Sequence, residues 1–177
     1  MKILMGLPFF VIGIIIFSPK KQNDDKVFLG NKLIELESYF KYRDSLDYNV
    51  SQVPVAWHLD HSLRTINEIS KTIKKSNPEE YRGSINLGRS MLLLTKSIPR
   101  GRAEAPKIVA PPDTISIDSL HFHLNEARVN LNAYDSLPKK AFFVHPYLGR
   151  LKKKTAKKFI EIHTEHHLKI IRDIMKK

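Results

Sequence analysis

The residues best suited to chemistry lie near the C-terminal end of the chain, in the run His163-Thr164-Glu165-His166-His167. The segment from Phe159 to Met175 has the apolar spacing of a helix. An α-helix turns by about 100° per residue, so His163 and His167 lie about 40° apart on neighbouring turns. Two imidazoles at this spacing can bind one metal ion. The same face carries the apolar side chains expected of a helix that packs against a core, namely Phe159, Ile170 and Ile174. The pair is therefore a candidate for two ligands of an internal metal site.

A third ligand has to come from another helix that faces the core. A second helix is expected to begin near Ser51 or Gln52, with Pro54 in its first turn. Its apolar stripe consists of Val55, Leu59, Ile66, Ile69 and Ile73. His58 lies about 70° from the centre of that stripe, at the edge of the core, whereas His61 lies about 130° away and is expected to face outward. His58 is therefore the candidate third ligand, although a boundary histidine satisfied by a hydrogen bond explains it as well.

The other histidines of the predicted helices are weaker candidates. His166 lies at i+3 from His163, at an angle that places it at the boundary of the last helix. His121 and His123 lie on the flanks of a helix whose apolar face contains Ile117, Leu120, Leu124, Ala127 and Leu131. Both are expected at the surface or at the core boundary.

The composition limits the kind of site and the kind of partner. The 177 residues include no cysteine, so disulfides, thiolate zinc sites and cysteine nucleophiles are excluded, and a metal must be held by histidine with carboxylates or water. The formal charge is +12, and much of the excess lies between Lys152 and Lys158. A basic surface can bind nucleic acid, anionic lipid or acidic small molecules. No aromatic residues interleave the lysines and no nucleic-acid motif is present, so nucleic-acid binding is not expected.

Residues 1–21 form a hydrophobic leader whose apolar run extends from Ile3 to Phe17. This run is shorter than the roughly 20 residues of a comfortable membrane span, but no small-x-small cleavage site follows it. We therefore expect an uncleaved transmembrane anchor and a membrane localisation, with the side of the membrane unresolved. A cleaved signal segment, giving a secreted or periplasmic protein, is the alternative. Residues 22–30 read as a linker, and residues 31–177 as one domain.

Apolar spacing in residues 31–177 predicts four longer helices and a short one. The first helix is capped by Asn31. The short helix covers residues 87–96, and the helix that follows it is capped by Asp113 or Ser116. Residues 98–113 contain four of the ten prolines and are expected to be a loop. Residues 138–151 are expected to form an unusually apolar loop. Since neither repeats nor long strand-like alternation occur, the predicted fold is all-α, a four-helix bundle with one short additional helix.

Four segments occur in an order that resembles a known family. They are Trp57 to Leu63 (WHLDHSL), Ile98 to Pro106 (IPRGRAEAP), His145 to Leu151 (HPYLGRL) and His163 to Leu168 (HTEHHL). Together they resemble the DinB-like superfamily, and specifically a branch of unassigned function. The resemblance implies a four-helix bundle with a divalent metal held by one histidine of the second helix and an H-x-x-x-H pair of the last. Carried over to this sequence, these ligands are His58, His163 and His167, the same three that the helix faces select.

The resemblance also implies a class of activity. Relatives include thiol-dependent transferases and isomerases, so we expect a metal-dependent enzyme, with zinc or nickel as the metal. It would activate a low-molecular-weight thiol or water for transfer to, or hydrolysis of, a small-molecule substrate. His145 and Glu165 are candidates for acid–base or supporting roles beside the ligands. The alternative is a non-catalytic, membrane-associated helical module with structural histidines, whose lysines contact anionic lipid or a partner. A homodimer is compatible with either.

Overall fold

The computed structural model describes residues 28–101 and 104–176, and this part of the chain is mostly helical. Its α-helices are α1 (Gly30–Ser38), α2 (Val55–Lys75), α3 (Leu87–Thr95), α4 (Ile117–Asn132) and α5 (Lys153–Ile174). One antiparallel hairpin is formed by β1 (Phe142–His145) and β2 (Gly149–Lys152). The mostly helical prediction is thus confirmed, whereas the hairpin departs from an all-α fold.

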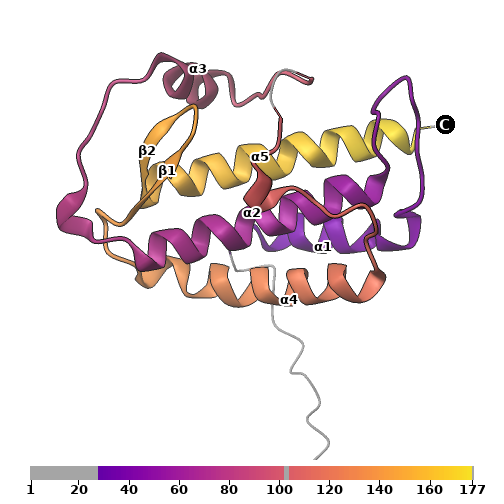
Figure 1. Cartoon of the computed structure of the whole chain (residues 1–177), viewed down its shortest axis with the longest axis horizontal. Coiled ribbons are helices and arrows are strands. Elements are labelled where there is room, and N and C mark those ends of the chain that lie inside the picture. The colour runs from indigo at the N-terminus through magenta and orange to yellow at the C-terminus, as the bar shows by residue number, and fades with distance from the viewer. Residues whose placement is uncertain (1–27, 102–103, 177) are drawn as a thin grey trace, which may run out of the picture.

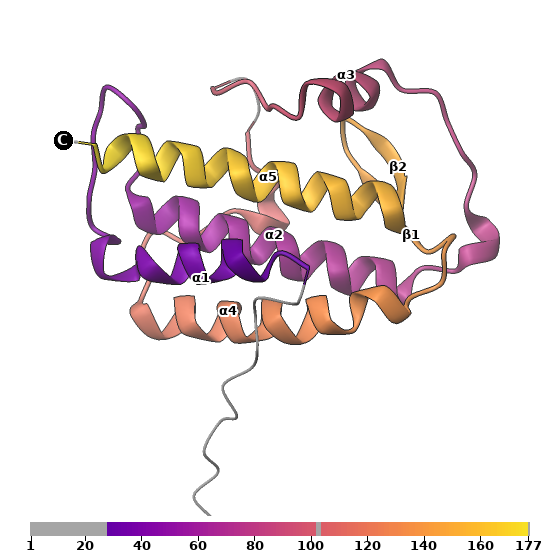
Figure 2. The same cartoon turned by 180° about the vertical axis from the view of Figure 1, so that it is seen from behind.

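Helices α1, α2, α4 and α5 run side by side along the long axis of the molecule (Figures 1 and 2). Both α1 and α2 contact α4 and α5. The short helix α3 lies apart from these four, next to the hairpin, in both views. The layout therefore leaves α2 and α5, which carry the histidines singled out above, in direct contact along their lengths.

Helix α2 is covered on more than one side. Its apolar stripe is buried as predicted, but polar side chains on its other faces are buried too, among them Asp60, Ser62, Asn67 and Ser70. Part of the extra cover comes from α4, where the backbone carbonyl of His123 accepts a hydrogen bond from Asn67. Another part comes from the proline-rich connection that follows α3, whose short 3₁₀ helix Lys107–Val109 contacts α2. A single apolar stripe is therefore not a sufficient guide to which side chains of α2 face solvent.

The helix termini show why the sequence predictions succeed at some boundaries and not at others. Ser116 caps α4 as predicted, because its side chain accepts a hydrogen bond from the amide of Ser119. Helix α2 begins at Val55, later than expected, with Pro54 as its N-cap residue. The Ser51 hydroxyl does not cap the helix, because it binds the carbonyl of Val53 and the ring of His58.

The apolar segment predicted as a loop contains the hairpin. Phe142 pairs with Lys152 and His145 with Gly149, which leaves a three-residue connection. Gly149 has φ +68°, the left-handed conformation that such connections place after a turn and that glycine adopts without strain. Phe143 and Leu151, which are paired across the strands, are both buried. The apolar residues thus pack one side of the hairpin onto the helices.

The predicted anchor, residues 1–21, lies outside the described residues, as does the linker up to residue 27. No helix in residues 28–101 or 104–176 is long and apolar enough to cross a membrane. This finding contradicts the predicted membrane localisation.

Candidate metal centre

Three histidines from α2 and α5 converge in the interior. One nitrogen each of His61, His163 and His167 lies within 4.8 Å of the other two. Their ring centroids are 4.6–5.0 Å apart, and the three rings are steeply inclined to one another. His61 and His167 are buried, and His163 is partly buried. The structure thus brings together the predicted pair His163 and His167, which project from neighbouring turns of α5.

The third member of the group is His61, and not His58. The prediction that His61 faces outward is wrong, because its side chain is only 5% exposed. The 3₁₀ helix at residues 107–109 covers this side of α2, and the ring nitrogen Nδ1 of His61 lies 2.9 Å from the carbonyl oxygen of Val109. A carbonyl can only accept a hydrogen bond, so Nδ1 carries the proton and Nε2 is left with its lone pair.

His58 is buried as predicted, but it contacts one member of the group. Its Nδ1 lies 3.0 Å from Nδ1 of His167, and its Nε2 lies 2.9 Å from the hydroxyl of Ser51. Both nitrogens of His58 are therefore engaged. His58 adjoins the three converging histidines without joining them.

The environment keeps these imidazoles neutral. Burial lowers the pKa of His58 to about 3, and the neighbouring His61, His166 and Arg100 add to the effect. Burial is also the main reason why the pKa values of His61, His163 and His167 are lowered. Only a neutral imidazole has a lone pair for a metal ion. Burial therefore favours the neutral imidazole, which is the state that can bind a metal ion.

Aromatic rings surround the three histidines. Trp57 stacks on His61, with ring centroids 4.8 Å apart and an interplanar angle of 24°. Phe159, one turn before His163 on α5, contacts the ring of His163 at 5.5 Å and that of His145 at 4.9 Å. Trp57 is the only tryptophan of the chain, so its fluorescence reports directly on this site.

His145 comes from the end of β1, in the hairpin. Its Nδ1 accepts hydrogen bonds from the backbone amides of Tyr147 and Leu148, at 3.1 and 3.2 Å. Burial lowers its pKa to about 4, so near neutral pH the ring is uncharged and carries its proton on Nε2. The hairpin thus holds His145 as a neutral hydrogen-bond donor beside Phe159, whose ring also contacts His163.

The surroundings of Glu165 do not match the acid–base role expected for it. It forms ion pairs with Lys32 and with Arg172, which also binds Glu35. Burial alone would raise the pKa of Glu165, but the hydrogen bonds from Lys32 and Arg172 outweigh this effect and lower it. Glu165 therefore remains a carboxylate that joins α5 to α1.

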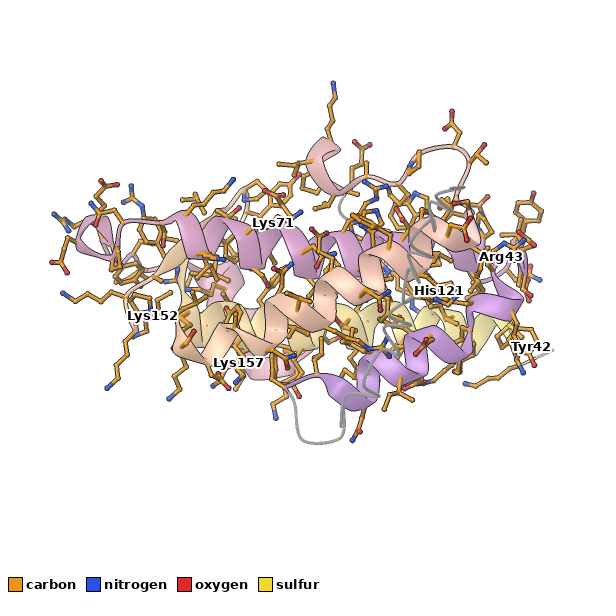
Figure 3. All side chains as sticks on the ribbon, turned by 90° about the horizontal axis from the view of Figure 1, so that it is seen from below. Tyr42, Arg43, Lys71, His121, Lys152 and Lys157 are labelled. Atoms are coloured by element: carbon orange, nitrogen blue, oxygen red, sulfur yellow. The ribbon has the colours of Figure 1, made fainter. Side chains whose placement is uncertain are left out.

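The remaining histidines lie where the sequence places them. His121 is exposed on α4, near Arg43, and its ring packs edge-on against Phe40 (Figure 3). His123 is partly buried, and its Nε2 lies 3.9 Å from the carboxylate of Asp60, away from the three converging histidines. His166 is partly buried and forms a hydrogen bond with the backbone of Ile98. The predictions of surface or boundary positions are confirmed for all three.

No family model, curated protein or solved structure matches the chain. The function is therefore inferred from the geometry of the site.

The sequence contained one signal for His61. His58 and His61 are separated by three residues, so they lie about 60° apart on one side of a helix, and a helix that buries one of them can bury both. The decisive information is the position of Val109, which lies 48 residues further along the chain and after the proline-rich connection. Helical periodicity cannot predict the contact between His61 and Val109.

Proposed function

We propose that this protein binds a divalent metal ion through His61, His163 and His167. The observation that carries the proposal is the convergence of three ring nitrogens within 4.8 Å. Zinc binds imidazole nitrogen at about 2.0–2.1 Å, which places two ligand nitrogens of a tetrahedral site about 3.4 Å apart, so small ring rotations suffice to close the group on an ion. The hydrogen bond of His61 to Val109 supports the fit, since it leaves Nε2 of His61 free.

Three neutral ligands with no fourth protein ligand are typical of catalytic sites, whereas structural zinc sites have four protein ligands. A divalent ion in such a site supplies Lewis acidity that lowers the pKa of a bound thiol or water. We therefore propose a metal-dependent transferase or hydrolase with a small-molecule substrate. The DinB-like four-helix bundle suggested by the sequence is compatible with this proposal, with His61 in the place first given to His58.

The aromatic walls and His145 would have separate tasks. Trp57 and Phe159 shield the site from water on two sides, which strengthens electrostatic interactions within it. His145 offers a proton on Nε2, because its Nδ1 is occupied by two backbone amides. It is suited to donate a hydrogen bond to a substrate or leaving group in this region.

Metal binding is tested on the metal-free full chain by titration with zinc and with nickel. Binding is followed by Trp57 fluorescence, by competition with a chromophoric chelator and by the melting temperature Tm. We expect one equivalent to bind and Tm to rise, because a ligand of the folded state at about 100 times its Kd stabilises by about 2.7 kcal/mol. Single substitutions His61→Ala, His163→Ala and His167→Ala should each remove most of this increase.

The matched control is His121→Ala, which removes an exposed histidine of α4 and should leave binding unchanged. If the unmodified chain binds neither zinc nor nickel and Tm does not shift, the proposed function is wrong. If binding persists in His61→Ala and is lost in His58→Ala, the ligand set is the one that the sequence alone suggested.

A further inference from the structure

The buried hydrogen bonds around His58 form a chain that ends at a backbone carbonyl. The Ser51 hydroxyl lies 2.9 Å from the carbonyl oxygen of Val53 and 2.9 Å from Nε2 of His58. Nδ1 of His58 in turn lies 3.0 Å from Nδ1 of His167. The chain therefore connects one of the converging histidines to the backbone before α2.

The carbonyl fixes the direction of every bond in this chain. The oxygen of Val53 can only accept, so the Ser51 hydroxyl donates its one proton there. The Ser51 oxygen must then accept at its other contacts, the amide of Val53 at 3.2 Å and Nε2 of His58, which places the proton of His58 on Nε2. Nδ1 of His58 consequently has the lone pair and accepts from Nδ1 of His167. His167 is thereby held with its proton on Nδ1 and its lone pair on Nε2.

The contacts are protected from water. His58 and His167 are 4% and 6% exposed. Trp57 packs across both rings, with centroids 5.4 Å from His58 and 6.2 Å from His167. A buried polar group without its partner has no water to replace it, so the cost of reversing one bond of the chain is high.

We propose that His58 is a positioning residue, which through Ser51 and Val53 fixes the tautomer and the orientation of His167 so that Nε2 faces the metal ion. This inference rests on the proposed metal site. Two of the proposed ligands are then supported in the same way, each by a backbone carbonyl that accepts a hydrogen bond. The carbonyl of Val109 accepts directly from His61, whereas the carbonyl of Val53 acts on His167 through Ser51 and His58. Partners of this kind, which bind the outer nitrogen of a ligating histidine, typically contribute about 10- to 100-fold to metal affinity.

The test compares three substitutions at the chain in the full-length protein. His58→Leu removes the acceptor, whereas His58→Asn keeps an acceptor oxygen close to the position of Nδ1. Ser51→Ala leaves the contact between His58 and His167 in place but removes the hydroxyl that sets its direction. His121→Leu, at an exposed histidine of α4, is the matched control for loss of an imidazole.

The readouts are the Kd for zinc, from chelator competition, and the protonated nitrogen of His167, from ¹⁵N NMR of the metal-free protein at neutral pH. We expect His58→Leu to weaken zinc binding about 10- to 100-fold, with a smaller loss for Ser51→Ala and near-normal binding for His58→Asn and for the control. His167 should carry its proton on Nδ1 in the unmodified chain and in His58→Asn, and should become a mixture of tautomers in Ser51→Ala.

Unchanged zinc affinity in His58→Leu, or a proton on Nε2 of His167 in the unmodified chain, would overturn the inference. The NMR measurement needs no variant, so it decides the direction of the chain even if His58→Leu does not fold. If the unmodified chain binds zinc and the variants have no effect, only the positioning role fails. If the unmodified chain binds no metal, it is the proposed function itself that is wrong.

Discussion

At the scale of single residues, His58 and His61 show how similar side chains acquire different roles. Both lie in the first two turns of α2 and both are almost fully buried. Nδ1 of His61 meets a backbone carbonyl, so its other nitrogen is free for a ligand. Both nitrogens of His58 are engaged by protein groups. The two histidines are three positions apart on one helix, and the proposed roles of ligand and support therefore differ only because the neighbouring atoms differ.

The buried histidines predict how stability depends on pH. In the folded, metal-free protein burial lowers the pKa of His58 to about 3 and those of His145 and His166 to about 4, whereas in the unfolded chain they titrate near 6.5. The unfolded state thus takes up more protons, and stability is lost as the pH falls below about 6.5. We expect Tm of the metal-free protein to be nearly constant from pH 8 to 7 and to fall steadily towards pH 4.5. A Tm that is flat or rises on acidification would contradict this expectation.

At the scale of elements, the site depends on segments outside α1, α2, α4 and α5. The connection after α3 supplies Val109, and the hairpin supplies His145. The lysines that open α5, unfavourable there for the helix dipole, also have local partners. Lys153 donates to the carbonyls of Asp135 and Leu137, and Lys157 forms an ion pair with Asp135. The lysine run therefore attaches the segment that follows α4 to the start of α5, while Lys152 is exposed.

The hairpin is attached to the start of α3 through Asn86, which donates to the carbonyl of Tyr147, and through Arg89. Its guanidinium donates to the carbonyls of Leu148 and Arg150 in the hairpin, and to that of Ser84 before α3. We expect Arg89→Ala to loosen the turn and to accelerate hydrogen exchange of the two amides that bind His145, those of Tyr147 and Leu148. Two-dimensional NMR of the full chain in deuterated buffer measures these rates.

The control for this prediction is Arg82→Ala, since Arg82 donates to nearby carbonyls, those of Glu79 and Tyr81, and to no hairpin residue that the structure describes. Exchange at the hairpin should not change in this variant. Equal rates in both variants would show that Arg89 does not hold the turn.

At the scale of the whole molecule, one continuous apolar core extends through α1, α2, α4 and α5 and includes residues of the hairpin. The proposed metal site lies within the contact of α2 and α5, whereas α4 packs on α2 without supplying a histidine to the group. Global stability and metal binding should therefore respond to different substitutions.

A pair of leucine substitutions tests this separation. Leu124 of α4 is fully buried and Leu94 of α3 is 78% exposed. Leu124→Ala should lower the free energy of unfolding by about 2–5 kcal/mol, because it leaves a cavity, and Leu94→Ala should change it by less than about 0.5 kcal/mol. Urea unfolding measures both. Zinc should still raise Tm of Leu124→Ala, and loss of that increase would show that the site depends on the packing of α4.

The sequence by itself determined most of the helices, because their apolar side chains recur with the helical period and their ends carry local signals such as Ser116. It also determined that His163 and His167 lie together, since one turn of α5 fixes their spacing. The hairpin escaped detection because its strands are four residues long, and their apolar residues read equally well as a loop.

Only the tertiary structure decided which histidine of α2 joins the pair on α5. Helical spacing orders the side chains around α2, but the rotation of α2 towards α5 and the cover of its remaining faces depend on contacts between distant segments. Val109 covers His61 from 48 residues away, and His167 meets His58 from 109 residues away. These two contacts give His61 a free nitrogen and leave His58 with none, a distinction that no local periodicity encodes.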